Sequence, residues 1–66
     1  MLSILIPTYN YNVYPLVTEL KNQADVLGID YEILVQDDGS SFYLEENRKI
    51  NVLVNCFFFE NNYNSG

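Results

Sequence analysis

The chain has 66 residues, which limits it to one small domain or part of one. It contains one cysteine and no histidine, which excludes an internal disulfide framework and histidine-dependent catalytic pairs and argues against a zinc site. The formal net charge is −6 with only three basic residues, so we expect neither nucleic acid nor an anionic membrane surface as a partner.

The amino-terminal residues predict a strand followed by a polar loop. Leu2–Ile6 is a short apolar run, and Pro7 is expected to end it because proline cannot donate a ladder hydrogen bond. The next residues, Thr8–Asn12, are polar and are expected to form a loop.

An amphipathic helix is predicted between Val13 and Leu27, where apolar residues recur every three or four positions. Asn12 is expected to cap its start and Pro15 to lie in its first turn. Gly28 stands where the helix should end, since glycine readily adopts the left-handed backbone of a helix terminus.

The remaining residues predict a second strand, a short helix and a third strand. The second strand is expected over Tyr31–Gln36, with Asp37–Ser40 as a turn. Phe42–Lys49 is expected to be a short helix capped by Ser41, because its acids precede its bases as the helix dipole favours. Asn51–Phe59, rich in Val and Phe, is the third predicted strand, and the polar residues after it are expected to form no element.

This order of elements predicts a Rossmann-like α/β fold over residues 1–66, a parallel three-stranded sheet with β-α-β-α-β connectivity. The apolar runs Leu2–Ile6 and Val52–Phe59 suggest strands buried on both faces. A sheet this small, however, should leave one face and one edge uncovered, so we also expect a homo-oligomer in which Val52–Phe59 is buried against a second copy.

Targeting signals are not evident. The longest apolar runs are interrupted by Pro7, Gly28 and Asn55, so no bilayer span is expected, and Met1–Ile6 lacks the basic leader of a signal peptide. The single cysteine, Cys56, lies among apolar residues and is expected to be a buried, inert thiol. We therefore expect a cytoplasmic location, with any membrane attachment carried by parts of a parent protein outside these residues.

The candidate site follows from topology. In an open parallel sheet, ligands bind beyond the carboxyl ends of the strands, where Pro7–Asn12, Asp37–Ser41 and Glu60–Gly66 should meet. Tyr9 offers a ring that can stack on a planar base, although an ordinary half-buried loop aromatic fits the composition equally well.

The pair Asp37 and Asp38 has two readings. Carboxylates suit the N–H of a base or the hydroxyls of a ribose, whereas Asp-Asp-Gly-Ser is also a common turn sequence. The pair is a poor chelate, because neighbouring side chains of a strand point to opposite faces. The first loop contains neither G-x-G-x-x-G nor a Walker lysine, which argues against nicotinamide, flavin and P-loop enzymes.

Two of these segments together resemble family 2 glycosyltransferases. The run Ser3-Ile4-Leu5-Ile6-Pro7-Thr8-Tyr9-Asn10 is similar to the opening strand of that family, and Tyr31-Glu32-Ile33-Leu34-Val35-Gln36-Asp37-Asp38-Gly39-Ser40 is similar to its second strand and Asp-Asp-Gly-Ser signature. The tail Glu60–Gly66 is similar to the Asn-x-Gly segment that precedes a downstream motif of the family. The chain departs from the pattern at Ser41–Tyr43, where many members have a further acid and a Ser or Thr.

The resemblance implies the amino-terminal part of a GT-A domain that binds a nucleotide-sugar donor, usually a UDP-sugar. By position, Asp38 matches the acid that contacts the base and Tyr9 the aromatic residue that packs on it, while Pro7 and Thr8 shape the pocket through their backbone. Asp37 is a lesser candidate.

The catalytic machinery that the resemblance implies has no counterpart in these residues. The intact family enzymes use a divalent metal, Mn or Mg, held by an Asp-x-Asp motif, and a carboxylate base, and neither motif nor base can be assigned here. The resemblance therefore implies a segment that does not itself transfer sugar. A different class remains open: a non-catalytic α/β module that binds or self-associates.

Overall fold

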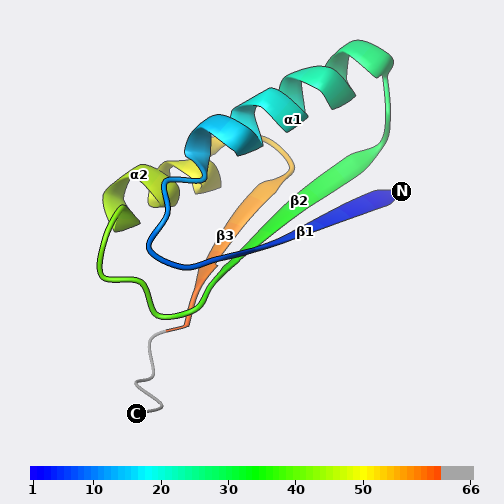
Figure 1. Ribbon diagram of the computed structural model, residues 1–66. Helices are drawn as coiled ribbons and strands as arrows, with labels where there is room; N and C mark the ends of the chain where they lie inside the picture. Colours follow the sequence, from blue (N-terminus) through cyan, green and yellow to red (C-terminus); the bar gives the residue numbers. More distant parts are fainter. Residues whose placement is uncertain (62–66) are drawn as a thin grey trace.

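The computed structural model describes residues 1–61, which form a parallel three-stranded sheet with two helices (Figure 1). The strands are β1 (Leu2–Thr8), β2 (Tyr31–Asp37) and β3 (Cys56–Glu60), and they lie side by side in the order β1-β2-β3. The helices are α1 (Tyr14–Leu27) and α2 (Leu44–Arg48). The predicted α/β class and β-α-β-α-β order are confirmed, and the layout is consistent with a Rossmann-like fold.

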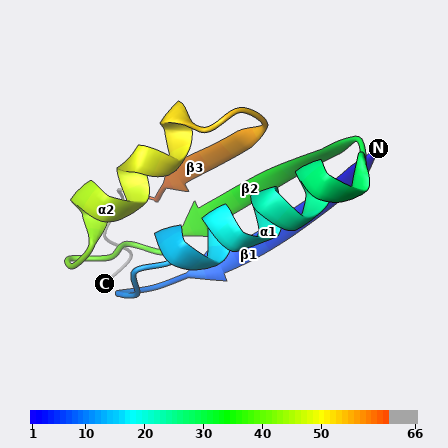
Figure 2. The same cartoon turned by 90° about the horizontal axis from the view of Figure 1, so that it is seen from above.

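Both helices lie on the same side of the sheet. Figure 2 looks onto that side and shows α1 over β1 and β2, with α2 toward β3. Side chains of the covered face interlock with the helix layer to form the core, and Ile33, Val35, Val17 and Ile50 are each fully buried. Because successive strand residues point to opposite faces, this packing leaves Leu34 and Phe57 on the other face.

The second face of the sheet is open, since no element within residues 1–61 covers it. Leu5 is 72% exposed, Phe57 45% and Phe59 49%, and the two phenylalanine rings stack with centroids 6.4 Å apart. The prediction that both apolar strands are buried on two faces is therefore wrong, because both helices pack on one side. The alternative expectation of one uncovered face is confirmed.

Helix α1 begins and ends close to the predicted positions. Its first residue is Tyr14, so Val13 rather than Asn12 is the capping position, although the Asn12 Oδ1 atom accepts a hydrogen bond from the Tyr14 N–H at 3.3 Å. Pro15 lies in the first turn as expected. Gly28 has a φ of +69° and ends the helix, in agreement with its predicted role.

The second half of the chain differs more from the prediction. Helix α2 starts at Leu44, after Tyr43 with a φ of +66°, and Ser41 does not cap it. A 3₁₀ helix, Lys49–Val52, follows directly and buries Ile50 in the core. The third strand therefore begins at Cys56 rather than Asn51, because the residues from Asn51 onward first complete the 3₁₀ helix that packs on the sheet.

The strand ends also extend further than predicted. Pro7 lies inside β1 instead of ending it, which is tolerated because β1 is an edge strand. Glu60, expected in the tail, is the last residue of β3, and the rest of the tail beyond Asn61 lies outside the described residues. Neither α1 nor α2, the helices of the described part, is long and apolar enough to cross a bilayer.

Candidate functional site

The carboxyl ends of the three strands meet at one end of the sheet, as the topology predicts. The last residues of the strands, Thr8, Asp37 and Glu60, are direct partners in the ladder. The pairing continues one step further, because the Asp38 N–H donates to the Thr8 carbonyl at 3.0 Å and the Asn61 N–H to the Asp37 carbonyl at 3.0 Å. The loops that follow β1 and β2 consequently leave the sheet side by side (Figure 1).

Tyr9 and Asp38 project from this shared end. Each directly follows a strand end, and the two strand ends are paired, so the candidate residues lie at the same end of the sheet. We call this end, with Tyr9 and Asp38 on it, the lip. Tyr9 is 62% exposed, and Asp38 is also exposed. An exposed phenol ring can stack on a flat heterocycle, and an exposed carboxylate at the same end of the sheet can accept its N–H groups.

Pro7 and Thr8 flank this pair from within β1. Thr8 is 8% exposed and lies on the covered face, while Pro7 is exposed on the open face. The Thr8 side chain is therefore withdrawn from solvent, and both residues set the course of the backbone that leads into Tyr9. The backbone role that the resemblance implies for Pro7 and Thr8 stays a prediction.

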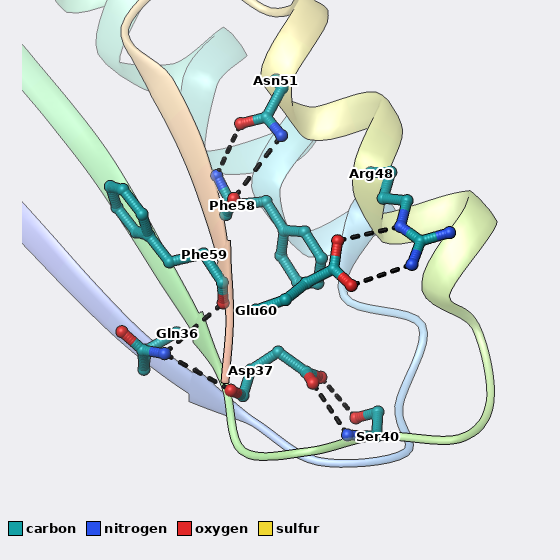
Figure 3. Close-up of polar contacts among 8 residues, drawn as sticks. All are labelled: Gln36, Asp37, Ser40, Arg48, Asn51, Phe58, Phe59 and Glu60. Atoms are coloured by element: carbon teal, nitrogen blue, oxygen red, sulfur yellow. Dashed lines mark hydrogen bonds and ion pairs between the residues drawn. The ribbon is translucent and has the colours of Figure 1, made fainter. Parts of the chain in front are cut away.

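Asp37 is directed inward and not toward the lip. Its side chain is 1% exposed, and one carboxylate oxygen accepts the Ser40 N–H at 2.8 Å while the other accepts the Ser40 hydroxyl (Figure 3). A buried carboxylate requires such hydrogen bonds, and here the turn provides them. The turn reading of Asp-Asp-Gly-Ser thus describes Asp37 in this structure, whereas Asp38 retains a solvent-facing side chain.

Hydrogen bonds of one side chain, Asn47, join α2 to the loop after β1. Asn47 is fully buried, its Oδ1 atom accepts the Val13 N–H at 2.9 Å, and its Nδ2 atom donates to the Tyr11 carbonyl at 2.8 Å. Sequence reasoning missed Asn47, because a polar residue in a short acidic and basic helix reads as part of its solvated face. The two hydrogen bonds fix the path of the chain from the lip into α1.

An ion pair borders the site on the β3 side. The Arg48 guanidinium donates to both carboxylate oxygens of Glu60, at 2.8 and 2.9 Å (Figure 3). The hydrogen bond from Arg48 lowers the pKa of Glu60, and the same contact raises the pKa of Arg48. Glu60, expected from the sequence among the loops beyond the strand ends, is therefore bound by Arg48 of α2.

Other features lie outside this end of the sheet. Cys56 is buried in the core as predicted, and burial raises the pKa of its thiol, which disfavours the reactive thiolate. A shallow hollow lined by Asn22, Gln23, Val26 and Leu27 lies on the last turns of α1, away from the lip. Across residues 1–61, no group of three or more potential ligands (His, Cys, Asp or Glu) is placed to hold a metal ion.

No family model, curated protein or solved structure matches this chain.

Proposed function

We propose that this chain is the amino-terminal, base-binding segment of a family 2 glycosyltransferase of GT-A fold, with a UDP-sugar as donor. The observation that carries the proposal is the pairing of Thr8 with Asp37 and the hydrogen bond from Asp38 to Thr8. Together they place an exposed aromatic ring and an exposed carboxylate on one lip of a parallel sheet. This is the end at which open α/β sheets bind nucleotides.

The strand order also favours a ligand site beside the carboxyl end of β1. In doubly wound sheets of order 3-2-1-4-5-6, the ligand crevice opens where the strand order reverses, which is beside β1. The described strands have the order of the first half of such a sheet, β1-β2-β3. Tyr9 follows β1 directly and would line that crevice.

The chemistry favours a base with N–H donors. The oxygens of the Asp38 side chain accept hydrogen bonds, and uracil presents its N3–H to such a group, while the Tyr9 ring can pack on the heterocycle. The chain has net charge −6, so the diphosphate needs backbone N–H groups or a divalent cation such as Mn or Mg to bind it. We assign base recognition to Tyr9 and Asp38 and no step of sugar transfer to these residues.

A titration with UDP tests the proposal. Amide signals of the ¹⁵N-labelled chain are followed while UDP is added, with and without manganese. We expect shifts confined to the loops around Tyr9 and Asp38, with little dependence on the metal. An unchanged spectrum at millimolar UDP would falsify the proposal.

Matched variants locate the site. Tyr9→Ala and Asp38→Asn should each weaken UDP binding by about tenfold, the effect of losing one stacking or charge-assisted contact. Tyr11→Ala removes a neighbouring ring that is 64% exposed, and Asp30→Asn neutralises an exposed acid at the opposite end of the sheet. These two controls should bind UDP as the unsubstituted chain does.

A non-catalytic self-association module is the second candidate function. The open face favours it, because Leu5, Phe57 and Phe59 form an exposed apolar surface across the sheet. The two proposals concern different surfaces, the lip and the open face, and can be tested independently.

A further inference from the structure

Asn10 joins the two loops that form the lip. Its backbone N–H donates to the Ser40 Oγ atom at 2.7 Å. Its side-chain Oδ1 atom accepts the N–H of Ser41 at 2.8 Å and that of Phe42 at 3.3 Å. One residue of the first loop thus makes three hydrogen bonds to consecutive residues of the second.

The backbone of Asn10 is adapted to this position. Its φ is +50°, in the left-handed region that most side chains avoid and asparagine tolerates. On the other loop, Gly39 has a φ of +82°, where glycine is free of strain. Both loops therefore turn sharply next to the exposed residue that each presents, Tyr9 or Asp38.

The link extends from the lip into the sheet. The Ser40 hydroxyl accepts from Asn10 and donates to the buried carboxylate of Asp37. Asp37 is the last residue of β2 and is held by the ladder on both sides. A continuous set of hydrogen bonds thus connects the first loop to the carboxyl end of β2, the central strand of the sheet.

We propose that Asn10 is a positioning residue for nucleotide binding, because its amide holds the loop of Tyr9 against the loop of Asp38 before the ligand arrives. The inference rests on the proposed function and assigns a role to a residue that does not itself need to touch the base. Tyr9 lies between Thr8, held in the ladder, and Asn10, held by the second loop. Such preorganisation strengthens binding, since the ligand does not have to order the loops.

The test compares two variants of Asn10 with one matched control. Asn10→Gly keeps the left-handed backbone but removes the Oδ1 acceptor, and Asn10→Asp restores an acceptor. Asn12→Ala is the matched control, because Asn12 makes a hydrogen bond of similar kind to Tyr14 within its own loop and helix. UDP affinity, amide hydrogen exchange and thermal unfolding are measured on each, with uridine titrated in parallel to separate charge repulsion between the new carboxylate and the diphosphate.

We expect Asn10→Gly to weaken UDP and uridine binding by about tenfold and to accelerate exchange of the Ser41 and Phe42 amides. Asn10→Asp should recover most of the uridine affinity. Asn12→Ala should change stability without a selective loss of affinity. Equal affinity of Asn10→Gly and the unsubstituted chain, or an equal loss in Asn12→Ala, would overturn the positioning role.

Failure of this inference is distinguishable from failure of the proposed function. If the unsubstituted chain does not bind UDP, the proposed function and the positioning role are both refuted. If the unsubstituted chain binds and Asn10→Gly binds as tightly, only the positioning role is refuted.

Discussion

The two faces of the sheet are built from the same strands and have opposite environments. On the covered face, Ile33 and Val35 are fully buried under α1 and the 3₁₀ helix, and polar groups there are satisfied by specific side chains such as Asn47. On the open face, Leu5 and Phe57 stand in solvent. The difference shows that an apolar strand sequence does not by itself predict which side chains are buried. Burial depends on which face of the sheet the helices cover.

The largest expected effect contrasts two adjacent residues of β2. Ile33→Ala should lower the free energy of unfolding by about 2–5 kcal/mol, because it leaves a cavity in the core. Leu34→Ala, on the open face, should cost less than about 1 kcal/mol since the side chain has solvent on one side. Urea denaturation measures both, and similar losses would mean that the open face is covered in solution.

Removing the buried amide should have the next largest effect. Asn47→Ala deprives the Val13 N–H and the Tyr11 carbonyl of their partner in a buried site and should cost about 1–3 kcal/mol. Asn22→Ala, at an exposed position of α1, is the control and should be nearly neutral. Thermal unfolding compares them, and a neutral Asn47→Ala would show that water replaces the amide.

The open face is tested by its effect on self-association. The unsubstituted chain is expected to associate at millimolar concentration, and Phe57→Lys should shift it toward monomer because the lysine charge would have to be buried. Val26→Lys alters another apolar side chain, 86% exposed on α1, and should leave association unchanged. Sedimentation velocity distinguishes these outcomes, and an unsubstituted chain that stays monomeric contradicts the predicted homo-oligomer.

The smallest expected effect is the pH dependence of the ion pair between Arg48 and Glu60. The pKa of Glu60 lies below its usual 4.5 because of Arg48, so the pair stabilises the fold at pH above 4.5 and this contribution is lost as pH falls through the lowered pKa. Arg48→Gln should raise the pKa of Glu60 toward 4.5, and Lys49→Gln should not. Carboxyl ¹³C titration reports the value directly, and an equal pKa in both variants would rule out the ion pair in solution.

Local patterns predicted much of the fold. The apolar stripe between Val13 and Leu27 and the glycine at position 28 specify α1, and the alternation of elements specifies a parallel sheet. Parallel strands bring their carboxyl ends together, so the common location of Tyr9 and Asp38 could be inferred before any coordinates. These features depend on short segments or on topology alone.

The features that escaped prediction depend on contacts between distant segments. Asn10 and Asn47 bond to residues about 30 or more positions away, which no spacing in the chain reveals. The valine-rich residues before Cys56 favour a strand locally, so the sequence predicts too early a start for β3. Burial of Ile50 by tertiary packing holds the preceding segment in a 3₁₀ helix instead. Exposure of Phe57 likewise depends on where both helices pack.

The contacts of Asn51 restrict how the sheet can grow. The Asn51 side chain accepts the Phe58 N–H at 2.8 Å (Figure 3). The Cys56 N–H donates to the Leu53 carbonyl, so these two outer donors of β3 are occupied. These occupied donors favour β1 as the edge at which a fourth strand would join. There, Pro7 has no N–H to offer, so a joining strand would lack one ladder hydrogen bond two residues before Tyr9.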